Sequence, residues 1–227
     1  MLQFRPGKKA CVAIDPGHQR KGDTAKEPIG PGSDRTKIKV ADGTVGLYSG
    51  LAEYELNLKV GLLLREELEK RGYDVVMTRT SNDVNISNAE RAKIAENENA
   101  DVFLHIHANA SDDPNDNGVL TICMTRNNPY CANLYRESRR LSYAVLDALT
   151  AATGAKKLGV SETDDMSGIN WASMPVTIIE MGFMSNEKED RLIAMAEYQT
   201  KLVSGIANGI DRYLNFHDAM AETRVVS

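Results

Sequence analysis

The sequence predicts an α/β domain with a mainly parallel, twisted sheet and helices on both faces. Short apolar runs that are typical of buried strands alternate with amphipathic, helix-like segments, and Gly, Pro and Asn separate them. No internal repeat or low-complexity linker divides the 227 residues. We therefore expect a single domain over residues 1–227, with its core at about 10–214 and a polar, frayed tail at 215–227.

The charge balance limits the kinds of partner. The chain has 27 basic and 32 acidic residues, a net charge of -5 and a pI near 5.5. This composition offers no cationic field for a nucleic acid backbone, so we expect no nucleic acid partner. No apolar run approaches the roughly 18 residues of a membrane span, and the N-terminus has no hydrophobic signal core. We expect a soluble monomer.

Three cysteines are too few for a disulfide framework. Cys11 lies in a strand-like run, so we expect a small buried hydrophobic side chain. Cys123 and Cys131 lie close enough in sequence to bridge across a loop, and the sequence leaves their pairing open.

The first half of the chain contains three strands and two helices. Residues 10–14 predict a buried strand that ends in a turn before His18, and the Gly- and Pro-rich residues 19–50 predict a long surface loop. The helix that follows begins near Glu53 and ends at Gly72, with apolar residues three or four apart. The next elements are a strand at 73–78, a helix opened by a capping box at residues 87–90, and a strand at 102–106.

The second half continues the alternation. We expect a strand at 118–124, a helix at 132–153, a short strand and polar loop within 157–166, a buried strand at 175–179, and a last helix through residue 214. In open α/β sheets, ligands gather beyond the carboxyl ends of the strands. His18, His107 and Glu180 each come directly after a strand-like run, and Glu53 can reach the same edge from its helix start.

This set of side chains suits a zinc hydrolase. Catalytic zinc takes three protein ligands from His, Asp and Glu and keeps one position open, and hydrolysis also needs a carboxylate that can act as general base. A single histidine at a strand end is more often structural, but several such groups at one edge weaken that interpretation. His105 and His107 lie on the same strand face and could chelate one ion together, so spacing cannot choose between them. His217, in the polar tail, is discounted.

Four motifs resemble a known family. They are DPGH at 15–18, EYELNL at 53–58, HIHANAS at 105–111 and IIEMGFMSN at 178–186. In this order, over residues 10–214, they are similar to the motifs of the zinc-dependent N-acetylmuramoyl-L-alanine amidases, the Amidase_3 family of cell-wall amidases. The resemblance implies one Zn²⁺ per chain held by His18, Glu53 and His107, and it implies Glu180 as the catalytic carboxylate.

The family pattern also bears on two ambiguous residues. The family's second metal histidine directly precedes Ala-Asn, which is His107 here, and the residue two positions earlier is usually serine. His105 is therefore a departure, expected to orient a ligand or line the cleft. Glu55 could be mistaken for the ligand, but alignment on the following Leu-Asn-Leu favours Glu53.

Five further residues are expected near the site. Arg91 resembles the arginine of the family's L-x-x-R segment and is expected to brace its helix. Asn109 and Asn186 are expected to fix loops through side-chain to backbone hydrogen bonds. Trp171 and Met174 could form a cleft wall or belong to the core.

The resemblance also implies a substrate and a setting. The expected reaction is hydrolysis of the amide bond between the lactyl group of N-acetylmuramic acid and the L-alanine of the stem peptide. Residues 22–46, broken by Pro and Gly, cannot form the autoinhibitory helix of some family members, so we expect an open cleft. No wall-binding repeat is visible, so affinity for peptidoglycan would come from the catalytic surface or from an unidentified targeting partner.

Two other functions stay open. One is a zinc peptidase that acts on the stem peptide, and the other is a non-catalytic wall-binding module of the same fold, against which Glu180 argues. The expected location is secreted or in the cell envelope, as for an autolysin or a sporulation or germination enzyme. A cytoplasmic phage lysin is the alternative.

Overall fold

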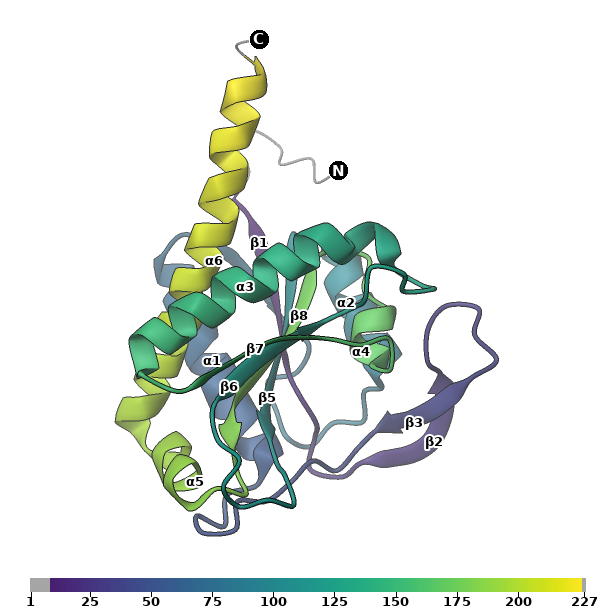
Figure 1. The fold of residues 1–227 in the computed structure, drawn as a ribbon. Coiled ribbons are helices and arrows are strands. Elements are labelled where there is room, and N and C mark those ends of the chain that lie inside the picture. Colours follow the sequence, from purple (N-terminus) through teal and green to yellow (C-terminus); the bar gives the residue numbers. More distant parts are fainter. Residues whose placement is uncertain (1–8, 226–227) are drawn as a thin grey trace.

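The computed structural model describes residues 9–225, with side chains described through Asn215, and its centre is a six-stranded sheet (Figure 1). The strand order is β4-β1-β5-β8-β6-β7. The strands are β1 (Cys11–Pro16), β4 (Asp74–Met77), β5 (Val102–Asn109), β6 (Val119–Cys123), β7 (Lys157–Glu162) and β8 (Val176–Phe183). Strands β4, β1, β5 and β8 run parallel, whereas β6 is antiparallel to β8 and parallel to β7. The expected mainly parallel sheet is confirmed.

Helices cover both faces of this sheet, as expected. One face carries the three long helices α1 (Glu53–Lys70), α3 (Tyr135–Thr153) and α6 (Ala196–Val225). The other carries α2 (Asn88–Asn97) and the single turn α4 (Ser167–Asn170). A 3₁₀ turn, η1 (Ala132–Leu134), leads into α3, and α5 (Glu187–Ala194) leads into α6.

Local signals fix the ends of these helices. In the capping box of α2, the backbone N–H of Glu90 donates to Ser87 Oγ at 3.2 Å and the N–H of Ser87 donates to Glu90 Oε2 at 2.7 Å. Helix α3 ends at Gly154, whose φ of 71° is left-handed and therefore suits glycine. The predicted beginnings and ends of these helices are thus confirmed to within a few residues.

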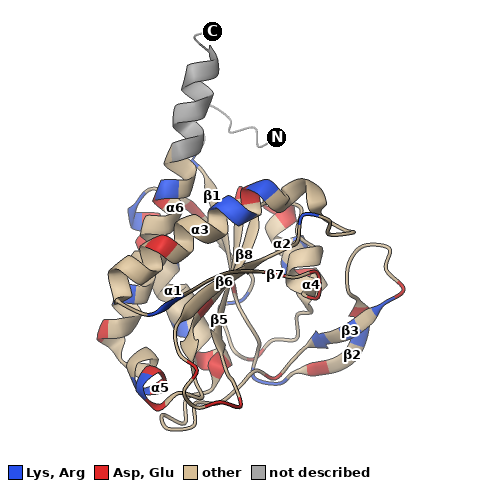
Figure 2. Cartoon of the chain, viewed as in Figure 1, with Lys and Arg blue, Asp and Glu red and all other residues tan. Residues whose placement is uncertain are grey.

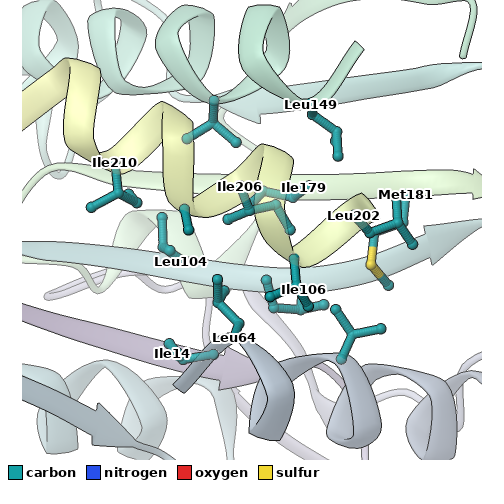
Figure 3. Packing of buried hydrophobic residues seen from close by; sticks show 14 of the residues in the cluster. Ile14, Leu64, Leu104, Ile106, Leu149, Ile179, Met181, Leu202, Ile206 and Ile210 are labelled. Atoms are coloured by element: carbon teal, nitrogen blue, oxygen red, sulfur yellow. The ribbon is translucent and has the colours of Figure 1, made fainter. Parts of the chain in front are cut away.

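The larger part of the core lies between the sheet and the three long helices (Figure 3). Alternate strand residues such as Ile14, Leu104 and Ile179 point to this side and are fully buried against α1, α3 and α6. Helices α3 and α6 approach closely at Gly209, where an added Cβ would lie 2.5 Å from the Cα of Val145. The opposite face has a smaller apolar cluster that includes Phe103.

Two expectations about the fold need correction. Residues 19–50 are not only a loop, because they contain an antiparallel hairpin of β2 (Asp23–Pro28) and β3 (Thr36–Val40). Its strands are mostly exposed and polar, so they lack the apolar alternation that marks a strand. Residues 215–225 are helical, since α6 continues to Val225. The described helices are each too short or too polar to cross a lipid bilayer.

Candidate active site

Three side chains from distant parts of the chain meet at the carboxyl ends of β1 and β5. His18 Nε2 lies 3.2 Å from Glu53 Oε1, and His107 Nδ1 lies 3.1 Å from the same oxygen. One ligand atom from each residue lies within 4.8 Å of the others. The structure therefore brings together the three residues that the sequence proposed as metal ligands.

The turn after β1 presents His18. The residue has a φ of 60°, a left-handed conformation that is uncommon outside glycine, so the turn holds the imidazole in a specific direction. Its Nδ1–H donates to the carbonyl of Ala41 at 2.8 Å, which leaves Nε2 facing Glu53. Gly17 must be glycine, because a Cβ there would lie 2.2 Å from the His107 ring.

Glu53 is the first residue of α1, and its buried carboxylate is held from several sides. Oε1 accepts from the backbone N–H of Ala108 at 3.2 Å, and Oε2 accepts from that of Thr44 at 3.0 Å. Burial would raise the pKa of Glu53, but hydrogen bonds from His107 and His18 outweigh it and hold the pKa far below its usual range. Glu55, the alternative considered from the sequence, is exposed and lies outside this cluster.

Glu180 faces the cluster from the neighbouring strand. In the parallel pairing of β5 and β8, Glu180 is in register with His107. Both residues lie within their strands, which run further than the predicted 102–106 and 175–179. Glu180 Oε2 is buried without a hydrogen-bond partner among the described residues. Removal from water raises the pKa of Glu180 to about 7, and the charge of Glu53 adds to the effect while His107 opposes it.

His105 points to the same face but does not join the cluster. Its Nδ1 lies 2.8 Å from Asp15 Oδ2, and its Nε2 lies 3.3 Å from the carbonyl oxygen of Gly168. The side chain is buried, with its ring against Phe103, and borders the cavity. This position agrees with the expectation that His105 lines the cleft.

A buried ion pair supports the turn that carries His18. Arg91 is fully buried and donates to Asp15 Oδ1 at 2.7 Å, to the carbonyl of Pro16 at 2.9 Å and to that of His18 at 3.0 Å. Arg91 was expected to brace its own helix, and these bonds show that it also holds the end of β1. Burial raises the pKa of Asp15, but the charge of Arg91 and the hydrogen bond to His105 bring it well below its usual range. Asp15 begins the DPGH motif, but its sequence context alone does not indicate this role.

A cavity of about 620 Å³ opens onto the site. The hairpin strand β3 and the turn at Ser167 and Gly168 form its walls, and His18, Glu53, His105, His107 and Glu180 lie on its floor. No helix of the described residues 22–46 fills it, so the expected open cleft is confirmed. Trp171 and Met174 do not line this cavity, and Met174 is buried in the core. The core alternative therefore holds for Met174, and Trp171 packs partly buried against the same apolar cluster.

The remaining expectations concern residues around the site. Asn186 caps α5, accepting from the N–H of Glu189 at 3.2 Å, and it donates to the carbonyl of Pro114 at 2.8 Å. Asn109 Oδ1 accepts from the neighbouring N–H of Ala110 at 2.8 Å. The side-chain to backbone hydrogen bonds expected of both are present. The cysteines 11, 123 and 131 are all buried, and they form no disulfide within the described part of the chain, so Cys123 and Cys131 are not paired there. His217 lies outside the residues with described side chains.

The donor atoms fit a metal ion. Two imidazole nitrogens and one carboxylate oxygen converge, and the cavity leaves room for a water molecule and a substrate carbonyl on the open side. A carboxyl group with a pKa near neutrality stands beside them, where a general base would be needed. The fold and the site together define an α/β domain suited to metal-assisted hydrolysis.

Comparisons with known proteins identify the family. A family model described as N-acetylmuramoyl-L-alanine amidase, Amidase_3, matches residues 12–212. The chain is 32% identical to YqiI of Bacillus subtilis over 75% of this chain and 78% of that protein. It is 31% identical to the amidase LytC of B. subtilis over 89% of this chain and 35% of LytC, so it spans about a third of that relative. Ami1, an amidase of Mycobacterium smegmatis, superposes with a TM-score of 0.82 and 25% identity, covering 91% of this chain and 97% of Ami1.

The chain belongs to the Amidase_3 family of N-acetylmuramoyl-L-alanine amidases. The family resemblance of the four sequence motifs is thereby confirmed, and so is the fold class, because the related structures share the mostly parallel α/β domain. The family is a family of enzymes, which agrees with the expectation that this chain is one.

Proposed function

We propose that this chain is a peptidoglycan amidase, a single catalytic domain that hydrolyses the bond between the lactyl carbonyl of N-acetylmuramic acid and the amino group of L-alanine. The observation that carries the proposal is the partnerless carboxyl oxygen of Glu180 beside the cluster of His18, Glu53 and His107. Family membership supplies the substrate class. The cell envelope is the proposed place of action, since peptidoglycan is there.

Zinc is the proposed metal, one ion per chain, held by His18, Glu53 and His107. Mixed nitrogen and oxygen donors of this kind are typical of catalytic zinc sites. When bound, Zn²⁺ makes a water molecule more acidic and polarises the scissile carbonyl. The hydrogen bond from His18 to Ala41 supports this role, because it fixes the tautomer that offers Nε2 to a metal.

Glu180 carries the proton in the proposed reaction. Its carboxylate accepts a proton from the attacking water, whose oxygen forms a bond to the lactyl carbon. As the carbon–nitrogen bond breaks, Glu180 returns that proton to the leaving nitrogen. The products are a carboxylate on the glycan and a free amino group on L-alanine. A pKa near 7 suits both transfers, since the group can hold and release a proton at neutral pH.

Digestion of purified peptidoglycan tests the proposal. The new termini are labelled and identified after incubation with the wild-type chain, with and without a metal chelator. We expect free L-alanine amino groups on the stem peptides, with the glycan strands left intact, and we expect the chelator to abolish their appearance. New termini within the stem peptide would indicate the zinc peptidase instead. Sedimentation of the chain with peptidoglycan and no new termini would indicate the binding module.

A matched pair of variants controls for the loss of a carboxylate. Glu180→Gln removes the proposed base, whereas Glu55→Gln removes an exposed carboxylate that does not line the cavity. We expect amidase products from Glu55→Gln and almost none from Glu180→Gln.

A further inference from the structure

A second groove, larger than the cavity at the site, lies at the opposite edge of the sheet. Because β6 runs antiparallel to β8, its end at Cys123 and the following start of α3 lie at the amino ends of the parallel strands. Between η1, α3 and α6 the surface is hollowed by about 790 Å³. Five arginines and three tyrosines line this arginine groove: Arg126, Arg136, Arg139, Arg140, Arg212, Tyr135, Tyr143 and Tyr213.

The positive charge of the arginine groove is only partly neutralised. Arg139 pairs with Glu162 at 3.0 Å, and Arg140 pairs with Glu137 at 3.0 Å. Arg136 approaches a carboxylate only at 3.9 Å, and its side chain is 86% exposed. Arg126 and Arg212 are exposed and form no ion pair with residues 9–215. Within the described residues, Arg126 and Arg212 thus add positive charge that no carboxylate pairs with, and basic segments mark α3 and the neighbouring turn of α6 in Figure 2.

Aromatic rings hold several of these guanidinium groups in place. The Cζ atom of Arg126 lies 5.6 Å from the ring centre of Tyr135, and that of Arg139 lies 4.8 Å from the ring of Tyr143. Such contacts reduce the conformational freedom that an arginine would lose on binding an anion. Because guanidinium groups cover these rings, the rings are poor stacking platforms for nucleic acid bases.

The start of α3 adds to the positive electrostatic potential of the arginine groove. This helix has 19 residues, and its N-cap residue, Leu134, makes no capping hydrogen bond through its side chain. The residues around this helix start, Ala132, Asn133 and Tyr135, line the groove. The N-terminus of a long helix favours anions, and phosphate groups in particular. The polarity of α3 and the arginine side chains therefore favour the same ligand charge, and Glu137 in the first turn of α3 offsets part of it.

We propose that the arginine groove binds a linear anionic polymer of phosphodiester-linked polyols. Planar guanidinium forks match the paired oxygens of phosphate, and the described residues that line the groove include no lysine. Arg136 and Arg140 are one helical turn apart, a rise of about 6 Å, which is near the spacing of successive phosphates in a phosphodiester chain. The exposed amide of Asn133 offers hydrogen bonds to polyol hydroxyl groups between the phosphates.

The position of the groove separates this binding from catalysis. His107 and Glu180 lie towards the carboxyl ends of their strands, whereas the groove lies beyond the amino ends. A polymer held in the groove therefore leaves the cavity at the site accessible. Binding can be measured without any turnover, so failure of this proposal and failure of the proposed amidase activity are distinguishable.

Titration calorimetry with a short poly(glycerol phosphate) of defined length tests the proposal. The full chain is titrated at several NaCl concentrations and compared with the triple variant Arg126→Gln, Arg136→Gln, Arg212→Gln. We expect the triple variant to bind at least about 30-fold more weakly at low salt, and the slope of log K against log salt to fall by about three. Hydrolysis of a soluble glycan–peptide fragment should be unchanged in this variant.

A charge-matched control separates the groove from general electrostatics. The triple variant Lys59→Gln, Lys188→Gln, Lys201→Gln removes three exposed cations that do not line the groove. Retained polymer affinity in this control supports the proposal. Equal weakening in both variants, no binding by the wild-type chain, or equally tight binding of polyglutamate would overturn it. Tighter binding of single-stranded oligothymidine would assign the groove to nucleic acid instead.

Discussion

The two faces of the central sheet share the same strands but differ in chemistry. On β5, Leu104 and Ile106 point to the face of α1, α3 and α6, where the packing is apolar. The alternating residues His105 and His107 point to the face of α2 and α4, where buried polar groups surround a cavity. A single strand thus supplies both the core and the site.

The lengths of the covering helices explain the difference. The helices on the apolar face have 18, 19 and 30 residues, whereas α2 and α4 have 10 and 4. Short helices leave the carboxyl ends of β1, β5 and β8 uncovered on their side. The larger apolar core lies on one face, and room for a substrate remains on the other. The predictions below test that division.

The largest expected effect separates two histidines on the same strand face. We expect His107→Ala to lower the affinity for zinc at least about 100-fold and to abolish turnover, because a ligand is lost. His105→Ser should keep its zinc, because His105 contacts Asp15 and not Glu53. The zinc content of each variant after dialysis tests both expectations about zinc binding. Comparable loss of zinc from the two variants would mean that they chelate one ion as a pair.

Glu180→Gln should reduce turnover without removing the metal. Loss of general acid–base catalysis costs about 10³-fold in kcat, within the usual range of 10² to 10⁴. The amide keeps the shape of the side chain but cannot accept the proton. Turnover of a soluble glycan–peptide fragment and metal content are measured on the same sample. Retained hydrolysis would exclude Glu180 as the base.

Arg91→Met should destabilise the polar face. Asp15 would keep a buried negative charge with its main ion-pair partner removed, which costs about 3–5 kcal/mol in the free energy of unfolding. Urea denaturation measures the effect. Adding Asp15→Asn to Arg91→Met should recover part of the loss, because the buried charge is then absent. No recovery would show that the arginine acts through packing rather than charge.

Leu104→Ala should destabilise the apolar face with little effect on the site. Leu104 is fully buried, and such a truncation costs about 3 kcal/mol in the free energy of unfolding. We expect the folded variant to keep its metal and a kcat close to that of the wild type. A large loss of kcat at a temperature where the variant is folded would show that the two faces are coupled.

The smallest expected effect is on the pH profile. Glu180 must be deprotonated to accept a proton, so kcat/KM should rise by about tenfold per pH unit at acidic pH and then level off. Burial raises the pKa of Glu180 to about 7, and a bound cation would lower it, so the midpoint should lie at or below 7. Rates at fixed zinc concentration check this. A midpoint well above 7 would indicate another titrating group.

Much of this division was predictable from the sequence. The alternation of strands and helices and the apolar spacing in α1 predicted the sheet and its layers. The positions of His18, His107 and Glu180 after predicted strands indicated that they share one edge of the sheet, although β5 and β8 run past His107 and Glu180. Apolar spacing and helix-end residues are local features of the sequence, so they can be recognised without knowing which residues they contact in the fold. The choice of His107 over His105 needed the family pattern, because both side chains face the same way.

The missed features depend on contacts between distant residues. Arg91 and Asp15 are 76 positions apart, and charged residues usually indicate a solvated surface, so their buried pair could not be predicted. The β2–β3 hairpin was missed because Lys37 and other polar residues occupy both of its faces. The antiparallel direction of β6 follows from the loop at residues 110–118, which is rich in Asp, Asn, Pro and Gly and joins β5 to β6 without a crossover helix. The alternation of strands and helices elsewhere in the chain favoured a parallel strand instead.

The pairing of β5 with β8 determines what a shift in strand register would do to the site. His107 and Glu180 are opposite each other in register on adjacent strands. A slip of one residue would turn only the slipped strand's side chain to the apolar face and separate the pair. The same slip would place apolar side chains of that strand in the cavity. A chain with the wrong register would therefore lose both its apolar packing and its active site. A chain that forms the stable core accordingly has His107 and Glu180 aligned as well.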